Sequence, residues 1–498
     1  MAFRATFLAV VGVTLAGHVG ALGFEMAAAA RFGTGREADA LAFALIVTVT
    51  IAGELSGWVS TIFLPLYVEV LATNPAGAAA FLRKALWALA GVTTACGLLL
   101  ALGAPSLVQA LAPALASRGA VVVRAFAPIL VLAPLAGLFA AALQANGRFV
   151  AAGMRQLAWY SGGLAGVLVL ADTLGAVAAP LGMLTGMVLF VAMLAYPALR
   201  MTRETSVRAA GPSLSHAVSL LVPLALLSLC VALNVAVERA LAARLPAGSL
   251  AALTYAYRLL HLPLALFVVN ATAMLLPTLA GYAVRGERDA VEALTRRALR
   301  MAVVFAVPLA ALSIALAEPL TRVLFERGAF TAASTAATST AIVWYAPGLV
   351  AMAVAQVLFR AFQALHALWG LAWTVGAGFA ISLVLMPALT ALVGFHGLPL
   401  ASSLASFAAV AFMLAGLRGR VPGLSGVLVS RSTAAIVGAG AVAAAAAWLT
   451  RDLASGAGLR LIMGGVAGVA VYTAVLRVLA PAEVRAAMAV VVPAWSRR

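Results

Sequence analysis

The chain of 498 residues is 65% hydrophobic and only 9% charged, and its mean hydropathy is +1.11. These values exclude a soluble globular protein and are typical of a polytopic membrane protein. A net charge of +17 would indicate nucleic-acid binding in a soluble protein. Here the basic residues gather at the ends of apolar segments, where the cytoplasmic loops of membrane proteins collect them, so no nucleic-acid partner is expected.

About fourteen apolar segments are long enough to cross a bilayer. They lie near residues 6–30, 40–71, 85–112, 120–145, 152–172, 175–198, 214–243, 250–282, 299–325, 336–362, 367–394, 397–417, 430–450 and 459–480. None of them alternates with a period of two, so membrane-spanning strands are not expected. The sequence therefore predicts an all-α polytopic membrane protein with about 14 transmembrane helices.

The distribution of Lys and Arg predicts the orientation of these segments. If the N-terminus is inside, 21 of the 32 basic residues lie on the cytoplasmic side, ten lie on the other side, and Arg258 lies within the membrane. Arg155 is one of the 21, at the start of an apolar segment. By the positive-inside rule, both termini and the loop 283–298 are expected to be cytoplasmic.

Four short stretches recur in the second half of the chain at a shift of 212 to 219 residues. The matching pairs are Ala29-Ala30-Arg31 with Ala242-Ala243-Arg244, Phe63-Leu64-Pro65 with Leu275-Leu276-Pro277, Ala104-Pro105 with Glu318-Pro319, and Ala142-Leu143-Gln144-Ala145 with Ala361-Phe362-Gln363-Ala364. Chance similarity between alanine-rich helices does not explain why prolines and basic residues coincide as well.

The repeat predicts two lobes of six helices each. Because six is an even number, the two copies have the same topology and a pseudo-twofold axis along the membrane normal. We expect an N-lobe over residues 1–210, a C-lobe over 211–420, and two further helices with a cytoplasmic tail over 421–498. Two lobes that face a central cavity are typical of an alternating-access transporter.

The apolar run 250–282 carries ionisable residues within its N-terminal half. Arg258 and His261 lie there, just before Pro263, and Thr254 falls on the same helical face. That face is expected to look into a wet cavity, where a guanidinium can hold a phosphate bidentately. The alternative is a snorkelling or structurally paired arginine.

Acidic residues at membrane depth form a second group of candidates. Glu54 lies near the middle of the second segment, where an unpaired carboxylate is costly, so it is expected to pair with Arg258 or to be protonated. Glu25 lies in the first segment, six or seven residues from His18, and the two can share a helical face.

Two further acids lie near helix ends. Asp39 opens the second segment, where a capping role at the positive helix terminus is expected. Glu238 directly precedes Arg239 and either pairs with a neighbouring base or binds a coupling cation. The sequence has no metal-binding spacing, and Cys96 and Cys230 lie inside apolar segments as small hydrophobic residues.

Several motifs of the chain resemble a known family. They are Gly23-Phe24, Arg31-Phe32-Gly33-Thr34-Gly35, Ala38-Asp39-Ala40, Tyr255-Ala256-Tyr257-Arg258-Leu259, Leu275-Leu276-Pro277, Glu318-Pro319-Leu320 and Leu324-Phe325-Glu326-Arg327-Gly328-Ala329-Phe330-Thr331. Together they are similar to the MurJ (MviN) family of lipid II flippases, within the multidrug/oligosaccharidyl-lipid/polysaccharide exporter superfamily. The likeness extends to about residue 420, and the block 327–331 is its most specific part.

This resemblance implies fourteen helices in two lobes, with two final helices that form a groove for a lipid tail. It also implies a flippase in the bacterial cytoplasmic (inner) membrane that serves peptidoglycan biosynthesis, cell wall biogenesis and cell shape. The implied substrate is an undecaprenyl-pyrophosphate-linked sugar. Arg258 matches the family's cavity arginine on the eighth helix, and Asp39 matches its second-helix aspartate.

The chain departs from the family pattern at several cationic positions. It has His18 where the family usually carries an arginine in the first helix, and it lacks another arginine near Phe24. In the second helix, Ala52 and Gly53 replace an arginine pair, and Glu54 stands close to a family glutamate. These departures weaken the expectation that lipid II itself is the substrate. They do not weaken the expectation that a related polyprenyl glycolipid is flipped.

We therefore expect a transporter, not an enzyme, that flips a lipid II-like precursor by alternating access as a monomer in the bilayer. The expected substrate-binding residues are Arg258, His18, Arg31, Asp39, Glu54 and His261, and the expected ion-coupling residues are Glu238 and Glu25. No cofactor is expected, and Na⁺, H⁺ or the membrane potential is the driving force. Cell-wall synthesis proteins are candidate partners.

Three other functions are considered beside the flippase. A cation-coupled multidrug exporter of the same superfamily would favour an acidic cavity, which Glu25 and Glu54 could supply. A non-transporting scaffold of envelope synthesis would agree with the missing arginines. An integral-membrane glycosyltransferase is disfavoured because no loop carries paired catalytic acids.

Overall fold

The computed structural model describes residues 2–73, 77–146, 148, 153–200, 214–264, 270–451 and 453–485. Every regular element within these ranges is a helix, which confirms the all-α prediction. Ten stretches of the described residues are helical, long and apolar enough to cross a membrane. Two of them, 155–200 and 368–417, each hold two helices joined by a short 3-10 turn. The total of 14 transmembrane helices stays a prediction.

The chain forms two compact units. Unit 1 comprises Met1–Ala251 with Arg327–Phe330, and unit 2 comprises Ala252–Glu326 with Thr331–Arg498. The helices of unit 1 are α1 (Ala2–Phe32), α2 (Arg36–Ala44), α3 (Ile51–Thr73), α4 (Ala78–Leu111), α5 (Ala116–Phe126), α6 (Ile129–Ala145), α8 (Arg155–Leu174), α9 (Ala178–Arg200) and α10 (Leu214–Ala242). The lobe boundaries that the repeat predicts, near 210 and 420, stay predictions.

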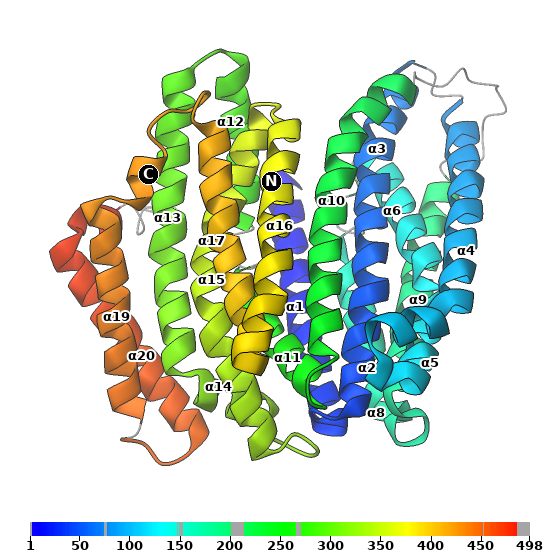
Figure 1. Cartoon of the computed structure of the whole chain (residues 1–498). Coiled ribbons are helices and arrows are strands. Elements are labelled where there is room, and N and C mark those ends of the chain that lie inside the picture. Colours follow the sequence, from blue (N-terminus) through cyan, green and yellow to red (C-terminus); the bar gives the residue numbers. More distant parts are fainter. Residues whose placement is uncertain are drawn as a thin grey trace. The chain divides into compact units, whose positions relative to one another are not determined.

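Helix α11 (Ser249–Leu264) begins in unit 1 and continues into unit 2. The other helices of unit 2 are α12 (Asn270–Val284), α13 (Arg288–Ala315), α14 (Ala317–Phe325), α15 (Ala332–Ala364), α16 (Leu368–Val393), α17 (Gly397–Leu417), α18 (Ser425–Leu428), α19 (Arg431–Arg451) and α20 (Ala457–Leu479). Figure 1 labels most of these elements.

The predicted segment 299–325 is wrong in its bounds. Helix α13 already begins at Arg288, because its first turns are polar and carry no hydropathy signal. It ends at Ala315, and the separate helix α14 begins at Ala317. Pro319 lies in the first turn of α14, where its missing N–H leaves no intrahelical hydrogen bond unmade.

Two other predicted segments are not described as one uninterrupted α-helix. The segment 40–71 contains a π-helix, Leu45–Thr50, between α2 and α3. In the run 250–282 the described residues form α11, which holds Pro263, and α12. Residues 265–269 of that run lie outside the described residues.

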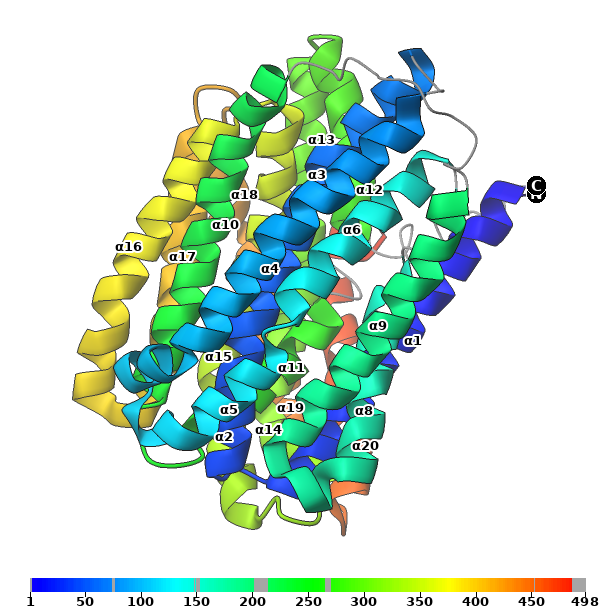
Figure 2. The same ribbon diagram turned by 90° about the vertical axis from the view of Figure 1, so that its right-hand side faces the viewer.

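Helices α8 and α9 cross with their backbones in contact. Gly162 and Gly166 on α8 face Gly182 and Gly186 on α9, and a Cβ on Gly182 would lie 2.2 Å from the carbonyl oxygen of Gly162. Small residues at a spacing of four allow this close approach, which is typical of helix pairs in membranes. Figure 2 shows the two helices side by side. The pair forms one wall of unit 1.

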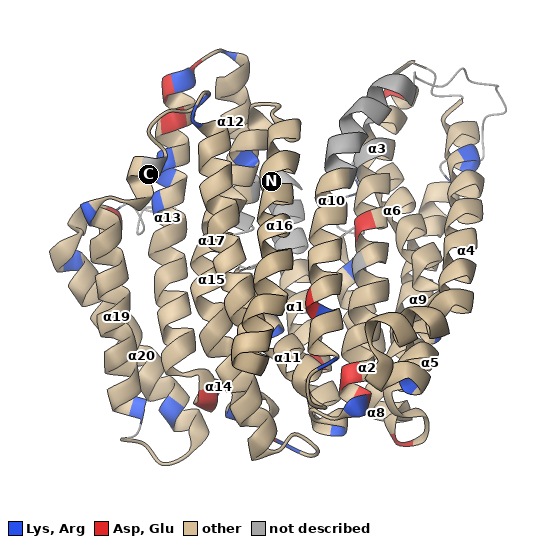
Figure 3. Ribbon diagram, viewed as in Figure 1, with Lys and Arg blue, Asp and Glu red and all other residues tan. Residues whose placement is uncertain are grey.

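Charged residues lie mainly near the helix ends, and the middle parts of the helices are largely uncharged (Figure 3). Large apolar side chains point outward from these middle parts. On α4, for example, Trp87 is 75% exposed and Leu102 is 76% exposed. Such exposure is unfavourable in water and favourable in lipid, so the protein is a multi-pass membrane protein.

The last two long helices, α19 and α20, pack against α13 (Figure 1). A Cβ on Gly440 would lie 2.5 Å from Val307, and one on Gly468 would lie 2.2 Å from Leu312. The Tyr472 hydroxyl donates to the carbonyl of Val304 at 2.7 Å. These helices are therefore an integral part of unit 2.

Candidate functional site

A polar pocket of about 320 Å³ lies inside unit 1. Helix α8 contributes its polar residues, and α3, α6 and α9 contribute mostly small or apolar ones. The lining residues are Val49, Ala52, Gly53, Ile129, Ala133, Arg155, Gln156, Trp159, Tyr160 and Met187. Of the residues that the structure describes, the lining contains one charged residue, Arg155, and no acidic residue.

Arg155 is the first residue of α8, and the packing of α3 on α6 holds its position. Its Nη1 donates to the Ser56 hydroxyl at 3.2 Å. Ser56 is fixed because α3 approaches α6 closely: a Cβ on Gly137 would lie 2.7 Å from the Ser56 Oγ. The Ser60 hydroxyl also donates to the Gly137 carbonyl at 3.2 Å. The guanidinium therefore has a defined place in the pocket.

The Arg155 side chain is accessible to a ligand. The residue is exposed, and part of its surface faces the pocket. Among the described residues, no ion pair includes Arg155, and Ser56 is a neutral partner. A positive charge in such surroundings is stabilised by an anion.

His18 on α1 lies next to a residue that lines this pocket. Its Nδ1 lies 3.3 Å from Nε2 of Gln156, which lines the pocket. Gly17 allows α1 to approach α8 here, since a Cβ on Gly17 would lie 3.1 Å from the Gln156 Cβ. The structure thus brings one predicted site residue, His18, to the edge of the pocket.

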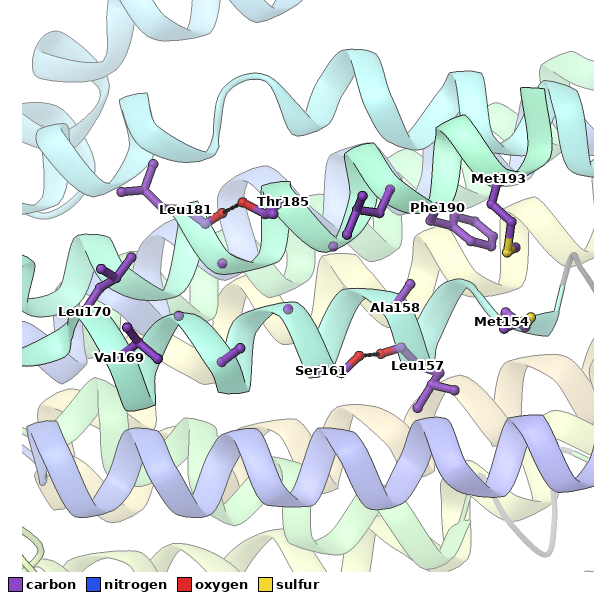
Figure 4. Close-up of a pocket in the computed structure, with 16 residues that line it drawn as sticks. Met154, Leu157, Ala158, Ser161, Val169, Leu170, Leu181, Thr185, Phe190 and Met193 are labelled. Atoms are coloured by element: carbon purple, nitrogen blue, oxygen red, sulfur yellow. Dashed lines mark hydrogen bonds between the residues drawn. The ribbon is translucent and has the colours of Figure 1, made fainter. Parts of the chain in front are cut away.

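A larger pocket, of about 670 Å³, runs along the opposite face of α8 (Figure 4). Its walls are mainly apolar side chains of α8 and α9. Its two hydroxyl residues donate to their own helices, Ser161 to the Leu157 carbonyl and Thr185 to the Leu181 carbonyl. It therefore offers little polar recognition and is not the candidate site.

In unit 2, helix α11 carries the predicted cavity residues. Arg258 is half-buried, and Thr254 on the same face is 6% exposed. The His261 ring stacks on Tyr257 with 3.5 Å between the ring centroids, and its Nδ1 lies 2.8 Å from the Tyr257 carbonyl oxygen. Tyr257 also meets Tyr345 of α15 edge to face at 6.2 Å. Aromatic packing therefore holds the helix that carries Arg258.

Asp39 caps a helix, but not the helix that the sequence predicts. It is buried within α2, and its carboxylate accepts hydrogen bonds from the backbone N–H groups of Gly248, at 2.6 Å, and Ala251, at 2.7 Å. These groups lie at the start of α11, where N–H groups have no intrahelical partner. The contact occupies both carboxylate oxygens.

Arg31 lies at the end of α1 and forms an ion pair with Asp172 near the end of α8. It is 13 residues from His18 on one continuous helix, so the two lie about 20 Å apart along the axis. The two side chains therefore do not contact one phosphate group together.

The predicted acids occupy separate places. Glu25 on α1 and Glu238 on α10 are buried, each about 4% exposed. Glu54 is half-buried on α3 and is not among the residues that line the pocket. Among the described residues, no cluster of three or more His, Cys, Asp or Glu could hold a metal ion. Ion coupling by Glu25 or Glu238 stays a prediction.

Arg155 and its neighbours are candidate site residues that were not predicted from the sequence. Arg155 lies at the start of an apolar segment, a position typical of a cytoplasmic basic residue. A signal was nevertheless present: Arg155, Gln156, Trp159 and Tyr160 fall at positions i, i+1, i+4 and i+5, on one side of a helix. Polar and aromatic residues on one side of an apolar helix indicate a polar cavity.

The most specific motif of the chain, residues 327–331, has a structural role at its glycine. Gly328 adopts a φ of +59°, and a Cβ there would lie 2.3 Å from the Ala30 carbonyl oxygen. The backbone N–H of Ala329 donates to that same oxygen at 2.8 Å. The motif thus docks on the end of α1 through a turn that requires glycine.

Glu326, directly before this motif, belongs to unit 2. The Thr335 hydroxyl donates to its Oε2 at 2.6 Å, and Arg322 Nε donates to the same oxygen at 3.1 Å. These two contacts lower the pKa of the Glu326 carboxyl from its ordinary value. Glu326 therefore carries a negative charge at neutral pH, next to the start of α15.

The chain is similar to a known protein family and to several of its members. The family model described as "Lipid II flippase MurJ" matches residues 28–464. A "Probable lipid II flippase MurJ" of Bdellovibrio bacteriovorus is 29% identical over 223 residues, which is 44% of this chain and 43% of that protein. The protein of the same name in Rhizobium meliloti is 33% identical over 115 residues, 23% of this chain and 21% of that protein. The matched stretches thus span less than half the length of these relatives.

Solved structures share the fold over a longer range. The structure "Lipid II flippase MurJ, inward closed conformation" matches with a TM-score of 0.80 and 20% identity, over 96% of this chain and 99% of that chain. An inward-facing multidrug resistance MATE family transporter matches with a TM-score of 0.68 and 14% identity, over 85% of this chain and 99% of that chain. Because the family model covers most of the sequence, the chain belongs to the lipid II flippase MurJ family.

Proposed function

We propose that the protein is a flippase that moves an undecaprenyl-pyrophosphate-linked sugar, a lipid II-like peptidoglycan precursor, across the cytoplasmic membrane. The observation that carries this proposal is the family match over residues 28–464. The all-helical fold and its likeness to a MurJ structure agree with it. The membrane-depth arginine Arg258 supplies the chemistry that a pyrophosphate needs.

In this proposal Arg258 holds the pyrophosphate by charge-assisted hydrogen bonds from its planar guanidinium. His261 and Tyr257 stack on each other and limit the freedom of α11 around it. The polyprenyl tail stays in lipid, beside α19 and α20, while the head group crosses. Two lobes that rock about a central axis give alternating access, with the membrane potential, Na⁺ or H⁺ as driving force. No covalent bond is made or broken, so a transporter role is sufficient.

The proposal includes an orientation with both termini in the cytoplasm. To test it, single cysteines are introduced at Asp289 and at Ser455, both exposed, after Cys96 and Cys230 have been replaced by serine. We expect a membrane-impermeant thiol reagent added to intact cells to label the cysteine at 455 and not the cysteine at 289, because basic loops stay inside. Labelling of 289 from outside contradicts the orientation.

A reconstituted flipping assay tests the function itself. Purified full-length protein is placed in vesicles with fluorescent lipid II, and the fraction of head groups that moves between leaflets is followed over time. We expect faster movement than in protein-free vesicles, and faster movement than with a polyprenyl-free phospholipid probe. Equal rates with and without protein, for lipid II and for other undecaprenyl-pyrophosphate sugars, contradict the proposal. Transport of hydrophobic cations in its place supports the multidrug-exporter alternative.

A further inference from the structure

We propose that the pocket of unit 1 is a phosphate-binding site in which Arg155 is the principal ligand, and that it receives a phosphate of the substrate's pyrophosphate group. The assignment to substrate rests on the flippase function proposed above. The assignment to phosphate chemistry rests on the pocket alone.

The charged group of the pocket favours an anion as ligand. Among the described residues, Arg155 is the single charged residue of the lining, and the contact that holds the guanidinium comes from a neutral hydroxyl, Ser56. A guanidinium has five N–H donors, so most of them remain available beside Ser56. The Arg155 side chain is exposed and lines the pocket, so an anion that enters the pocket can reach these donors.

The start of α8 adds backbone N–H donors and the positive end of the helix dipole. Helix α8 has 20 residues and begins at Arg155, and within the described part of the chain no side-chain hydrogen bond caps its N-terminus at Met154. The first backbone N–H groups of a helix lack intrahelical partners, and the helix dipole is positive there. Together with the Arg155 fork, this end of α8 is suited to phosphate oxygens.

The size and shape of the pocket limit what it accepts. About 320 Å³ holds a phosphate or pyrophosphate group, and is small for a whole glycolipid head group. Room for the anion comes from Ala52 and Gly53 on the opposite wall, and a Cβ on Gly53 would meet no atom within 4 Å. The Gln156 amide, held near His18, offers a further polar contact.

The described lining residues of this pocket include no acidic side chain, which also distinguishes classes of ligand. A site for a hydrophobic cation favours carboxylates and aromatic faces. Arg155 would repel such a ligand. The pocket therefore selects an anion over the cationic substrates of a drug exporter.

The first experiment measures the binding of inorganic pyrophosphate to the purified full-length protein by calorimetry. We expect wild type to bind and Arg155→Gln to bind about tenfold more weakly or worse, because a charge-assisted bidentate contact is lost. Arg155→Lys should fall between them, since lysine keeps the charge and loses the fork. Arg148→Gln, which changes the same charge at an exposed position outside the pocket, should bind like wild type.

A gain of affinity provides the complementary test. Gly53→Arg adds a second guanidinium where the structure leaves open space, so pyrophosphate should bind several-fold more tightly. Gly53→Gln, similar in length and uncharged, controls for the added side chain. If Arg155→Gln and Gly53→Arg both bind pyrophosphate like wild type while remaining folded, the pocket is not a phosphate site.

The second experiment separates a free anion from the lipid-linked one. Flipping of lipid II by Arg155→Gln is compared with wild type, and we expect it to be about tenfold slower. Unchanged flipping, together with Arg155-dependent binding of free pyrophosphate, overturns the substrate assignment. If wild type flips no pyrophosphate-linked lipid but binds pyrophosphate through Arg155, the proposed function fails and the phosphate site stands.

Discussion

Arg258→Ala is expected to abolish flipping of the pyrophosphate-linked lipid while the protein still inserts and folds. The change removes the proposed bidentate ligand from a half-buried position and deletes no packed apolar group. Loss of two charge-assisted hydrogen bonds corresponds to about 3 kcal/mol or more, a reduction in transport of roughly 100-fold or more. Arg258→Lys should recover part of the rate, because it keeps the charge without the planar fork. The measurement is flipping of lipid II in vesicles with equal amounts of each variant.

Arg418→Ala is the matched control, since it removes the same charge from an exposed position after α17. The competing explanation is a structural pair between Arg258 and Glu54, in which removing either partner costs about 3–5 kcal/mol. The double variant Arg258→Ala with Glu54→Ala distinguishes the two. A structural pair predicts that stability and transport return together, whereas a pyrophosphate ligand predicts that transport stays absent. Restored transport in the double variant contradicts the role of Arg258.

Asp39→Ala is expected to have the largest effect on stability among the predicted site residues. Its carboxylate accepts two backbone hydrogen bonds at the start of α11, and alanine leaves both buried N–H groups without that partner. Hydrogen bonds to a charged group contribute about 1.5–3 kcal/mol each, so a loss of about 3 kcal/mol or more is expected. The thermal unfolding temperature of the purified protein should fall by several degrees.

Two further variants show whether the capping contact is the cause. Asp39→Asn keeps one acceptor oxygen and should lose less stability than alanine. Glu37→Gln is the control, because Glu37 is an acid on the same helix. Glu37 lies 3.6 Å from Arg118, which is largely exposed. An exposed ion pair contributes little, so this substitution should lower the stability by less than about 1 kcal/mol. Equal unfolding temperatures for wild type and Asp39→Ala contradict the capping role.

The fold class could be predicted from the sequence because a bilayer imposes strict rules on composition. Apolar segments without a period of two leave helices as the spanning elements, and the structure has helices throughout its described residues. The bounds of α13 could not be predicted from hydropathy, since its first turns carry Arg288, Asp289 and Glu292. A polar turn at the end of a membrane helix looks like a loop in such an analysis.

The candidate site was predictable only in part, because tertiary contacts decide it. Arg258 could be recognised from its position in the middle of an apolar run. The partners of Asp39 could not, because Gly248 is 209 residues away in the sequence. In the sequence, Arg155 resembles a basic residue of a cytoplasmic loop. It becomes a pocket residue because Ser56 of α3 lies next to the start of α8. Local sequence patterns do not reveal contacts between residues that lie so far apart in the chain.

The most direct measurement compares the flipping of three glycolipids that share one sugar and one undecaprenyl chain but differ in the linker. One carries a pyrophosphate, one a monophosphate, and one no phosphate. Recognition by arginine predicts that wild type flips the pyrophosphate lipid fastest and the phosphate-free lipid at the rate of protein-free vesicles, and that Arg258→Ala removes this preference. Equal flipping of all three lipids by wild type would contradict a flippase that works by holding pyrophosphate.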